Sequence, residues 1–250
     1  MQKEFYVNDD GINLHCKLDK PDNTDKCPLL LMFHGLTGHM EEDHIVGTCK
    51  AVNAIGIATL RAEMYGHGKS GGKYEDHTLL KWIGNGLKII EYAKSLDFVT
   101  DLYISGHSQG GLLTILLAGM KPDVFKAVIP LSPALVIVDG ARKGQLLSMV
   151  FDPDHIPETL GKGERRIKGN YLASAQLLHP EEMMHKYHGP VLIVHGDNDL
   201  AVEIRYSIEA SKEYDNCTLV TVKDADHCFD GHLDELFKAV TDFLKALNKG

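Results

Sequence analysis

The chain has 250 residues, of which 44% are hydrophobic, so it is long enough to bury one sizeable core. Its formal charge is -9 at pH 7, and acidic and basic residues are mixed along the sequence without a run of Lys or Arg. This pattern argues against nucleic acid or an anionic membrane surface as a partner.

The N-terminal stretch and the cysteines indicate the cellular setting. Residues 1–21 contain no apolar segment long enough for a signal peptide, and nowhere do about 18 apolar residues run together. We therefore expect a soluble, cytoplasmic protein. The cysteines are odd in number and never spaced as C-x-x-C, which predicts neither a disulfide framework nor a zinc site. They are Cys16, Cys27, Cys49, Cys217 and Cys228.

Strands and helices are predicted to alternate along the chain. A hairpin around Asp10-Gly11 comes first, because Asp-Gly supplies the positive φ angles of a tight turn. Continuous apolar runs then predict strands buried on both faces, at 29–33, 57–60, 102–105, 127–131, 191–194 and 218–222. Helical segments lie between them, at about 41–55, 78–95, 109–120, 203–214 and 233–248. The alternation predicts an α/β fold with a mostly parallel central sheet flanked by helices.

One segment interrupts this rhythm. Residues 133–188 separate two predicted core strands by much more than a usual connection and contain no comparable apolar run. We therefore divide the chain into a core, residues 1–132 and 189–250, and an inserted cap, or lid, at 133–188.

The stretch 61–73, RAEMYGHGKSGGK, matches several glycine-rich motifs. A P-loop would need glycine where Glu63 stands, and this carboxylate would repel a phosphate. The G-x-G-x-x-G reading fails because no helix begins at the last glycine. What remains is G-x-S-x-G, which occurs at Ser70 and again at Ser108.

The context of the two serines favours Ser108 as a nucleophile. A nucleophile elbow needs a strand running into the serine, a helix leaving it and small neighbours. Ser108 follows DLYIS and precedes GGLLTILLAG, with Gly106 and Gly110 beside it. Ser70 has no adjacent strand or helix, and an ordinary strand-to-helix turn at Ser108 is the alternative.

A serine hydroxyl needs a base, and the base needs an orienting carboxylate, in the chain order acid then histidine. We favour His227, in the loop between the last strand and the last helix, with His232 as the alternative. Among the carboxylates we favour Asp199, which lies further into its loop than the alternative Asp197. The three side chains would form a Ser108-His227-Asp199 triad.

The oxyanion of acyl transfer needs backbone donors. The N–H of Gln109 follows the nucleophile at a helix N-terminus. The second donor is expected at Leu36, in the loop that follows the strand in LLLMFHGLTGH. The alternative is an ordinary His-Gly turn without a catalytic role.

The ordered motifs HGLTGH, GHGKS, GHSQGG, HGDND and DADHCF resemble those of the α/β-hydrolases, and more closely those of the bacterial cinnamoyl (feruloyl) esterases. The likeness extends along essentially the whole chain and into the insertion, through DPDHIPETL and KGNYLASAQ. It places the triad on Ser108, Asp199 and His227 and the oxyanion donors on Leu36 and Gln109. It also implies that stretch 61–73 is a structural turn beside the active-site rim.

The resemblance further implies a substrate and a way to bind it. Ring contacts would come from Tyr171, Asp139 and Gln145. The expected reaction is hydrolysis of hydroxycinnamate esters, with a small aromatic ester as partner and neither metal nor organic cofactor. A broad short-chain acyl esterase, a monoacylglycerol lipase and a non-catalytic ligand-binding protein are the alternatives. A homodimer is left open.

Overall fold

The protein begins with a hairpin that forms one edge of the central sheet. The computed structural model describes residues 1–22 and 24–247. Strands β1 (Gln2–Asp9) and β2 (Ile12–Asp19) pair antiparallel, and the turn between them has φ angles of 50° at Asp10 and 86° at Gly11. The predicted hairpin is therefore confirmed.

The central sheet has eight strands in the order β1-β2-β4-β3-β5-β6-β11-β12. The pairings of β1 with β2 and of β2 with β4 are antiparallel, and all others are parallel. The remaining strands are β3 (Cys27–Phe33), β4 (Ala58–Ala62), β5 (Val99–His107), β6 (Phe125–Leu131), β11 (Val191–Gly196) and β12 (Cys217–Val222). The predicted α/β class with a mostly parallel sheet is confirmed.

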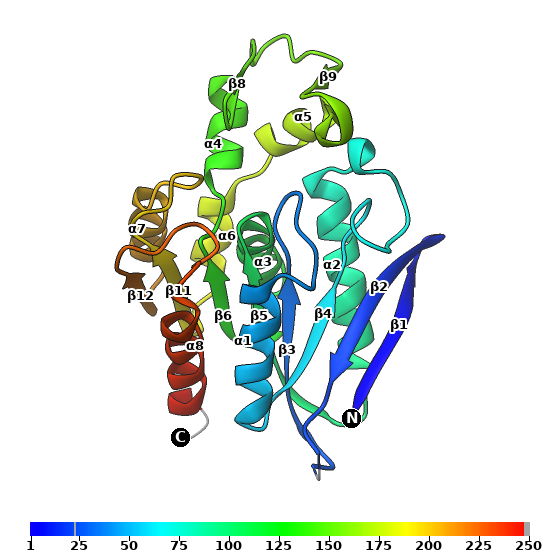
Figure 1. The fold of residues 1–250 in the computed structure, drawn as a ribbon, viewed down its shortest axis with the longest axis vertical. Helices are drawn as coiled ribbons and strands as arrows, with labels where there is room; N and C mark the ends of the chain where they lie inside the picture. Colours follow the sequence, from blue (N-terminus) through cyan, green and yellow to red (C-terminus); the bar gives the residue numbers. More distant parts are fainter. Residues whose placement is uncertain (23, 248–250) are drawn as a thin grey trace.

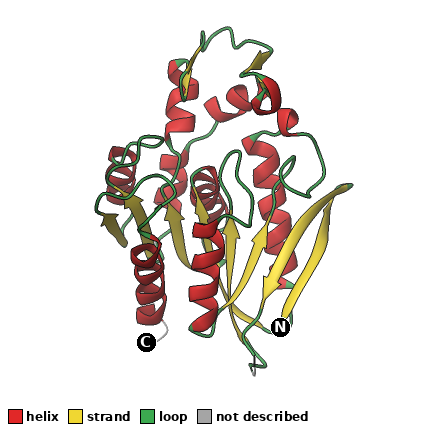
Figure 2. Ribbon diagram, viewed as in Figure 1, coloured by secondary structure: helices red, strands yellow, loops and turns green. Residues whose placement is uncertain are grey.

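Helices cover both faces of this sheet, as Figures 1 and 2 show. On one face lie α1 (Asp43–Ala54) and α8 (Leu233–Leu247), which pack against each other. On the other face lie α2 (Leu79–Lys94), α3 (Gln109–Met120), α6 (Pro180–Lys186) and α7 (Arg205–Glu213). A sheet covered in this way leaves no polar face, which explains the continuous apolar runs of its strands.

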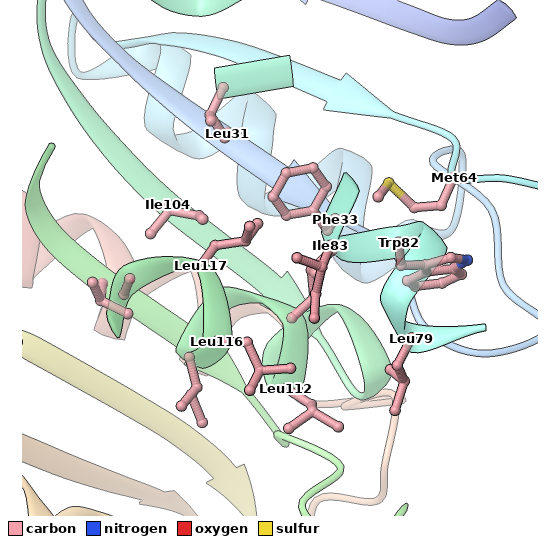
Figure 3. Packing of buried hydrophobic residues seen from close by; sticks show 14 of the residues in the cluster. Leu31, Phe33, Met64, Leu79, Trp82, Ile83, Ile104, Leu112, Leu116 and Leu117 are labelled. Atoms are coloured by element: carbon pink, nitrogen blue, oxygen red, sulfur yellow. The ribbon is translucent and has the colours of Figure 1, made fainter. Parts of the chain in front are cut away.

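Strand β3 shows how the core is built. Leu31 and Phe33 point toward α2 and α3 and belong to one cluster with Trp82 (Figure 3), while Leu30 and Met32 point toward α1 and α8. All of these side chains are buried. Full burial of an aliphatic or aromatic side chain contributes about 1.5–3 kcal/mol. The strand that precedes the expected oxyanion loop is thus held rigidly from both sides.

The segment between β6 and β11 lies beyond the carboxyl ends of the central strands in Figure 1. Helices α4 (Val136–Lys143) and α5 (Asn170–Gln176) pack against each other there. The strands of this segment are two residues long and form two small hairpins, β7 (Gln145–Leu146) with β8 (Met149–Val150) and β9 (Thr159–Leu160) with β10 (Ile167–Lys168). Helix α6 then returns to the core and packs on α3.

Short 3-10 helices connect this segment to the core. They are η1 (Tyr74–Asp76), before α2, and η2 (Gly163–Arg165), before β10. Arg166 pairs with Glu75, and Lys168 pairs with Asp76. These exposed ion pairs join the inserted segment to the loop that follows β4.

Candidate active site

Ser108 occupies the turn between β5 and α3 in a strained conformation. Its φ and ψ are 57° and -117°, although it is not glycine. Such a backbone costs about 1–3 kcal/mol and persists only where the surroundings impose it. Here Ser108 N–H donates to the Leu131 carbonyl at 2.9 Å, and its own carbonyl accepts from Ala134 N–H at 2.9 Å. The turn is thereby fixed to the end of β6.

The glycines beside Ser108 are required by close backbone contacts. A Cβ on Gly106 would lie 2.3 Å from the Gly110 carbonyl oxygen, and one on Gly110 would lie 2.4 Å from the Phe33 carbonyl oxygen. Real Cβ atoms do not approach that closely, so strand, turn and helix meet only when these residues lack side chains. This is the crowding expected of a nucleophile elbow.

Asp199 and His227 are joined by a short hydrogen bond. His227 Nδ1 lies 2.6 Å from Asp199 Oδ2, and the Asp199 side chain is fully buried. Asp199 Oδ1 accepts from the N–H groups of Ala201 and Val202, at 2.8 Å each. Burial opposes ionisation of this carboxyl, but hydrogen bonds from His195 and His227 outweigh it and hold the pKa of Asp199 well below its ordinary value. Asp199 is therefore a carboxylate at neutral pH.

The alternative residues make other contacts. Asp197 Oδ1 accepts from Asp224 N–H at 2.6 Å, and His232 Nδ1 lies 3.4 Å from Glu235 at the surface. Ser70 donates to the Glu63 carbonyl at 2.7 Å and accepts from His15 N–H at 2.8 Å. Only the His232 contact is local; the other bonds join segments at least seven residues apart in the chain.

His107 holds the loop of His227 against the elbow. Its Nε2 donates to the His227 carbonyl at 2.7 Å, and the centroids of the two rings are 4.6 Å apart. Burial lowers the pKa of His107 well below its ordinary value, and the neighbouring His44 and His227 lower it further. A neutral His107 beside Ser108 thus places the His227 loop next to the expected nucleophile.

The loop after β3 touches Ser108 from the other side. A Cβ on Gly35 would lie 3.0 Å from the Ser108 Cβ. His34 Nε2 accepts from Met64 N–H at 3.1 Å, so His34 Nδ1 carries the proton and donates to the Gly35 carbonyl at 2.8 Å. Burial lowers the pKa of His34 to about 3, which keeps this neutral form in place. The peptide between Gly35 and Leu36 is thereby oriented.

Two backbone donors are available beside the nucleophile. Among residues 1–22 and 24–247, the N–H groups of Leu36 and Gln109 meet no acceptor. Leu36 is half-buried, and Gln109, the first residue of α3, is fully buried. An N–H at a helix N-terminus favours negative charge. Both groups are thus free to donate to an oxyanion.

Tyr171, in α5, reaches the elbow through Gln109. Its hydroxyl donates to Gln109 Oε1 at 2.6 Å, and both side chains are fully buried. The Tyr171 ring also lies 4.9 Å from the ring of His77, centroid to centroid. Contact of this hydroxyl with a substrate ring stays a prediction.

Asp139 and Gln145 are engaged away from these residues. Asp139 Oδ2 accepts from the Tyr206 hydroxyl at 2.7 Å, and its carboxylate also pairs with Lys143. Asp139, Lys143 and Tyr206 line a groove of about 320 Å³ between α4, α6 and α7. Gln145 is exposed and donates to the Leu147 carbonyl within its own hairpin at 3.2 Å. Substrate binding by either residue stays a prediction.

Sequence reasoning missed His107 and His195. Both are buried, and both directly follow or precede a glycine of a motif, in G-H-S-Q-G and in H-G-D-N-D. A buried histidine inside such a motif was the available signal, but fourteen histidines in the chain hide it. Among the described residues, no group of three or more His, Cys, Asp or Glu side chains could hold a metal ion, and no helix is long and apolar enough to span a bilayer.

Known proteins share this architecture. Residues 24–168, more than half of the chain, match the family described as Serine aminopeptidase, S33. The chain belongs to this family. A solved structure of Est1E from Butyrivibrio proteoclasticus with ferulic acid bound is 52% identical, covers 98% of this chain and 100% of its own, and has a TM-score of 0.97. A second Est1E structure is 48% identical, covers 99% of both chains and has a TM-score of 0.93.

Curated relatives within the family match a smaller part. A monoglyceride lipase homolog of Monkeypox virus is 29% identical over 150 residues, which are 59% of this chain and 52% of that protein. The chain therefore spans about half the length of the curated relatives it matches. The structural matches, by contrast, extend along nearly the full chain and confirm the α/β-hydrolase fold.

Proposed function

We propose that this protein is a serine carboxylesterase that hydrolyses hydroxycinnamate esters, such as those of ferulate, caffeate and p-coumarate. The reaction class is supported by the strained Ser108 and by the Asp199–His227 pair, whose loop is bound by His107, the residue before Ser108. The substrate class is supported by the likeness to Est1E, which was solved with ferulic acid bound. That full-length likeness is the observation that carries the proposal.

In the proposed mechanism, Ser108 Oγ attacks the ester carbonyl while His227 Nε2 takes its proton. Asp199 binds His227 Nδ1–H and stabilises the imidazolium that forms. The N–H groups of Leu36 and Gln109 stabilise the oxyanion, each contributing about 3 kcal/mol. The alcohol leaves with the proton from His227, and water activated by the same base then frees the acid from the acyl-enzyme.

We further propose that residues 133–188 act as a cap over this site, on a core made of residues 1–132 and 189–250. The position of α4, α5 and the two small hairpins beyond the carboxyl ends of the strands supports this division, since ligands of open α/β sheets bind at that edge. We also propose a cytoplasmic location, which suits five free cysteines.

A second candidate is a monoacylglycerol lipase or a broad short-chain esterase. The Monkeypox virus relative, a monoglyceride lipase homolog, favours it. The triad does not decide between the two, because it acts on the carbonyl and not on the rest of the acyl group.

The test is steady-state hydrolysis of methyl ferulate, p-nitrophenyl acetate and p-nitrophenyl octanoate. We expect the highest kcat/KM with methyl ferulate and a loss of several orders of magnitude in Ser108→Ala. Ser70→Ala is the matched control, because it removes the serine of the other G-x-S-x-G and should leave the turnover number unchanged. Preference for the octanoate ester would support the lipase candidate, and an active Ser108→Ala would exclude the mechanism.

A further inference from the structure

A second histidine binds the carboxylate of Asp199. His195 lies at the end of β11, four residues before Asp199, and its side chain is fully buried. Its Nε2 lies 3.1 Å from Asp199 Oδ2, the same oxygen that His227 Nδ1 approaches to 2.6 Å. The proposed mechanism gives His195 no part, yet His195 and His227 both contact this oxygen.

The contacts of His195 define which of its nitrogens carries the proton. Its Nε2 also lies 2.9 Å from the Val202 carbonyl oxygen, so it faces two groups that only accept. Nε2 must therefore be the donor. Its Nδ1 lies 2.6 Å from Ser207 Oγ in α7, and in a neutral ring this nitrogen accepts a hydrogen bond from the hydroxyl. Ser207 is fully buried as well.

These bonds form one directed chain. The Ser207 hydroxyl donates to His195 Nδ1, His195 Nε2–H donates to Asp199 Oδ2, and His227 Nδ1–H donates to the same oxygen. Asp199 Oδ1 is meanwhile held by two backbone N–H groups. The carboxylate therefore has one fixed orientation, and β11 and α7 both contribute to it.

We infer that His195 is a positioning residue of the triad, which orients Asp199 and moderates its negative charge, and that Ser207 holds the His195 ring in the position this requires. The inference rests on the proposed function, because it concerns the acid of that triad. Without the Ser207 hydroxyl, His195 Nδ1 is buried without its partner and the ring loses the contact that fixes its orientation. Nε2–H would then point less directly at Asp199, and the second hydrogen bond to the carboxylate would weaken.

A loss of this donor has two measurable effects. The first is a fall in kcat of about tenfold, the effect of one hydrogen bond to a charged group. The second is a shift of the pH profile. A carboxylate with fewer donors holds more negative charge, so it stabilises a protonated His227 more strongly and the acid limb of kcat/KM moves to higher pH, by about half a pH unit. The other titratable groups near this pair are His107, His44, Glu42 and Cys228.

The experiment compares His195→Met, His195→Gln and Ser207→Ala with wild type, using the pH dependence of kcat and kcat/KM on p-nitrophenyl acetate. Methionine removes the donor, whereas glutamine keeps an N–H near the position of Nε2. We expect His195→Met and Ser207→Ala to lose kcat and to shift the acid limb upward, and His195→Gln to retain the wild-type profile. Ser211→Ala, whose hydroxyl donates to the Ile208 carbonyl in the same helix, is the control.

The outcomes separate this inference from the proposed function. Inactive wild type would overturn the esterase proposal itself. Active wild type with unshifted acid limbs in His195→Met and Ser207→Ala would overturn the positioning role while the esterase proposal stands. If His195→Met fails to fold, Ser207→Ala decides, because it leaves the imidazole in place and removes one oxygen atom.

Discussion

The hydroxyl of Tyr171 meets Gln109 inside the protein, one residue from the expected nucleophile. Tyr171→Phe removes that hydroxyl and leaves Gln109 Oε1 buried without its donor. We expect kcat/KM to fall about tenfold, because an unsatisfied buried acceptor costs about 1–3 kcal/mol and the N–H of Gln109 is a proposed oxyanion donor. The fall should be the same with methyl ferulate and with methyl cinnamate, which has no ring hydroxyl. The ratio of the two losses is the measurement.

Tyr74→Phe is the control for this prediction. The Tyr74 ring belongs to the same aromatic cluster, 4.8 Å from the ring of His77, centroid to centroid. Its hydroxyl has no partner among the described residues, so the variant should keep wild-type kinetics. A loss in Tyr171→Phe that appears with methyl ferulate alone would assign the hydroxyl to the substrate, as the resemblance implies.

Residue positions were predictable where chain order limits the choice. Ser108, Asp199 and His227 each follow a strand of the parallel sheet, so their meeting at one edge is expected from the pattern of elements. The direction of Asp139 was not predictable, because it lies in a helix, where a shift of one residue turns a side chain by about 100°. In the structure the Asp139 side chain accepts a hydrogen bond from Tyr206.

The elbow between β5 and α3 depends on backbone contact at Gly110. In Gly110→Ala the new Cβ would lie 2.4 Å from the Phe33 carbonyl oxygen. Both sides of this contact are backbone, so a change of side-chain rotamer cannot relieve it. We expect a loss of more than about 3 kcal/mol in the free energy of unfolding, since overpacking of backbone against backbone is not relieved by a change of rotamer. Urea unfolding measures it.

Gly84→Ala, in the neighbouring helix α2, should raise the free energy of unfolding and not lower it. Gly84 is exposed in α2, and a Cβ there would meet nothing within 4 Å. Alanine should therefore stabilise the protein by about 0.5–1 kcal/mol through helix propensity. Equal effects of the two substitutions would contradict the contact at Gly110.

Among the elements, length decided what the sequence could predict. The predicted helix at 109–120 coincides with α3, and the predicted strand at 218–222 lies within β12. These segments are long enough for their apolar pattern to be read. The strands of the insertion have two residues each, which is too short for any periodicity, and so they could not be predicted.

The whole molecule buries several neutral histidines, and its stability should therefore depend on pH. Burial lowers the pKa of His34 to about 3 and of His44 and His77 to about 4, from 6.5. The unfolded chain thus binds more protons than the folded one below pH 6.5. Stability should be complete above that pH and fall on acidification, by up to about 1.4 kcal/mol per pH unit for each such histidine.

Urea midpoints at pH 7, 6 and 5 measure this dependence. His44→Leu should reduce the slope of unfolding free energy against pH by about one proton. His155→Leu is the control, because the side chain of His155 is 85% exposed and its loss should leave the slope unchanged. Parallel slopes for wild type and His44→Leu would show that His44 titrates normally in the folded protein.

The return of the chain through α6 has an evolutionary consequence. Strands β6 and β11 are neighbours in the sheet, and α6 alone, packed on α3, makes the crossover that parallel neighbours require. Everything from α4 to the end of α5 is therefore additional to the topology. Insertions, deletions and exchanges in that stretch are compatible with an unchanged sheet, so the proposed cap could be altered while the elbow and the loops after β11 and β12 stay in place.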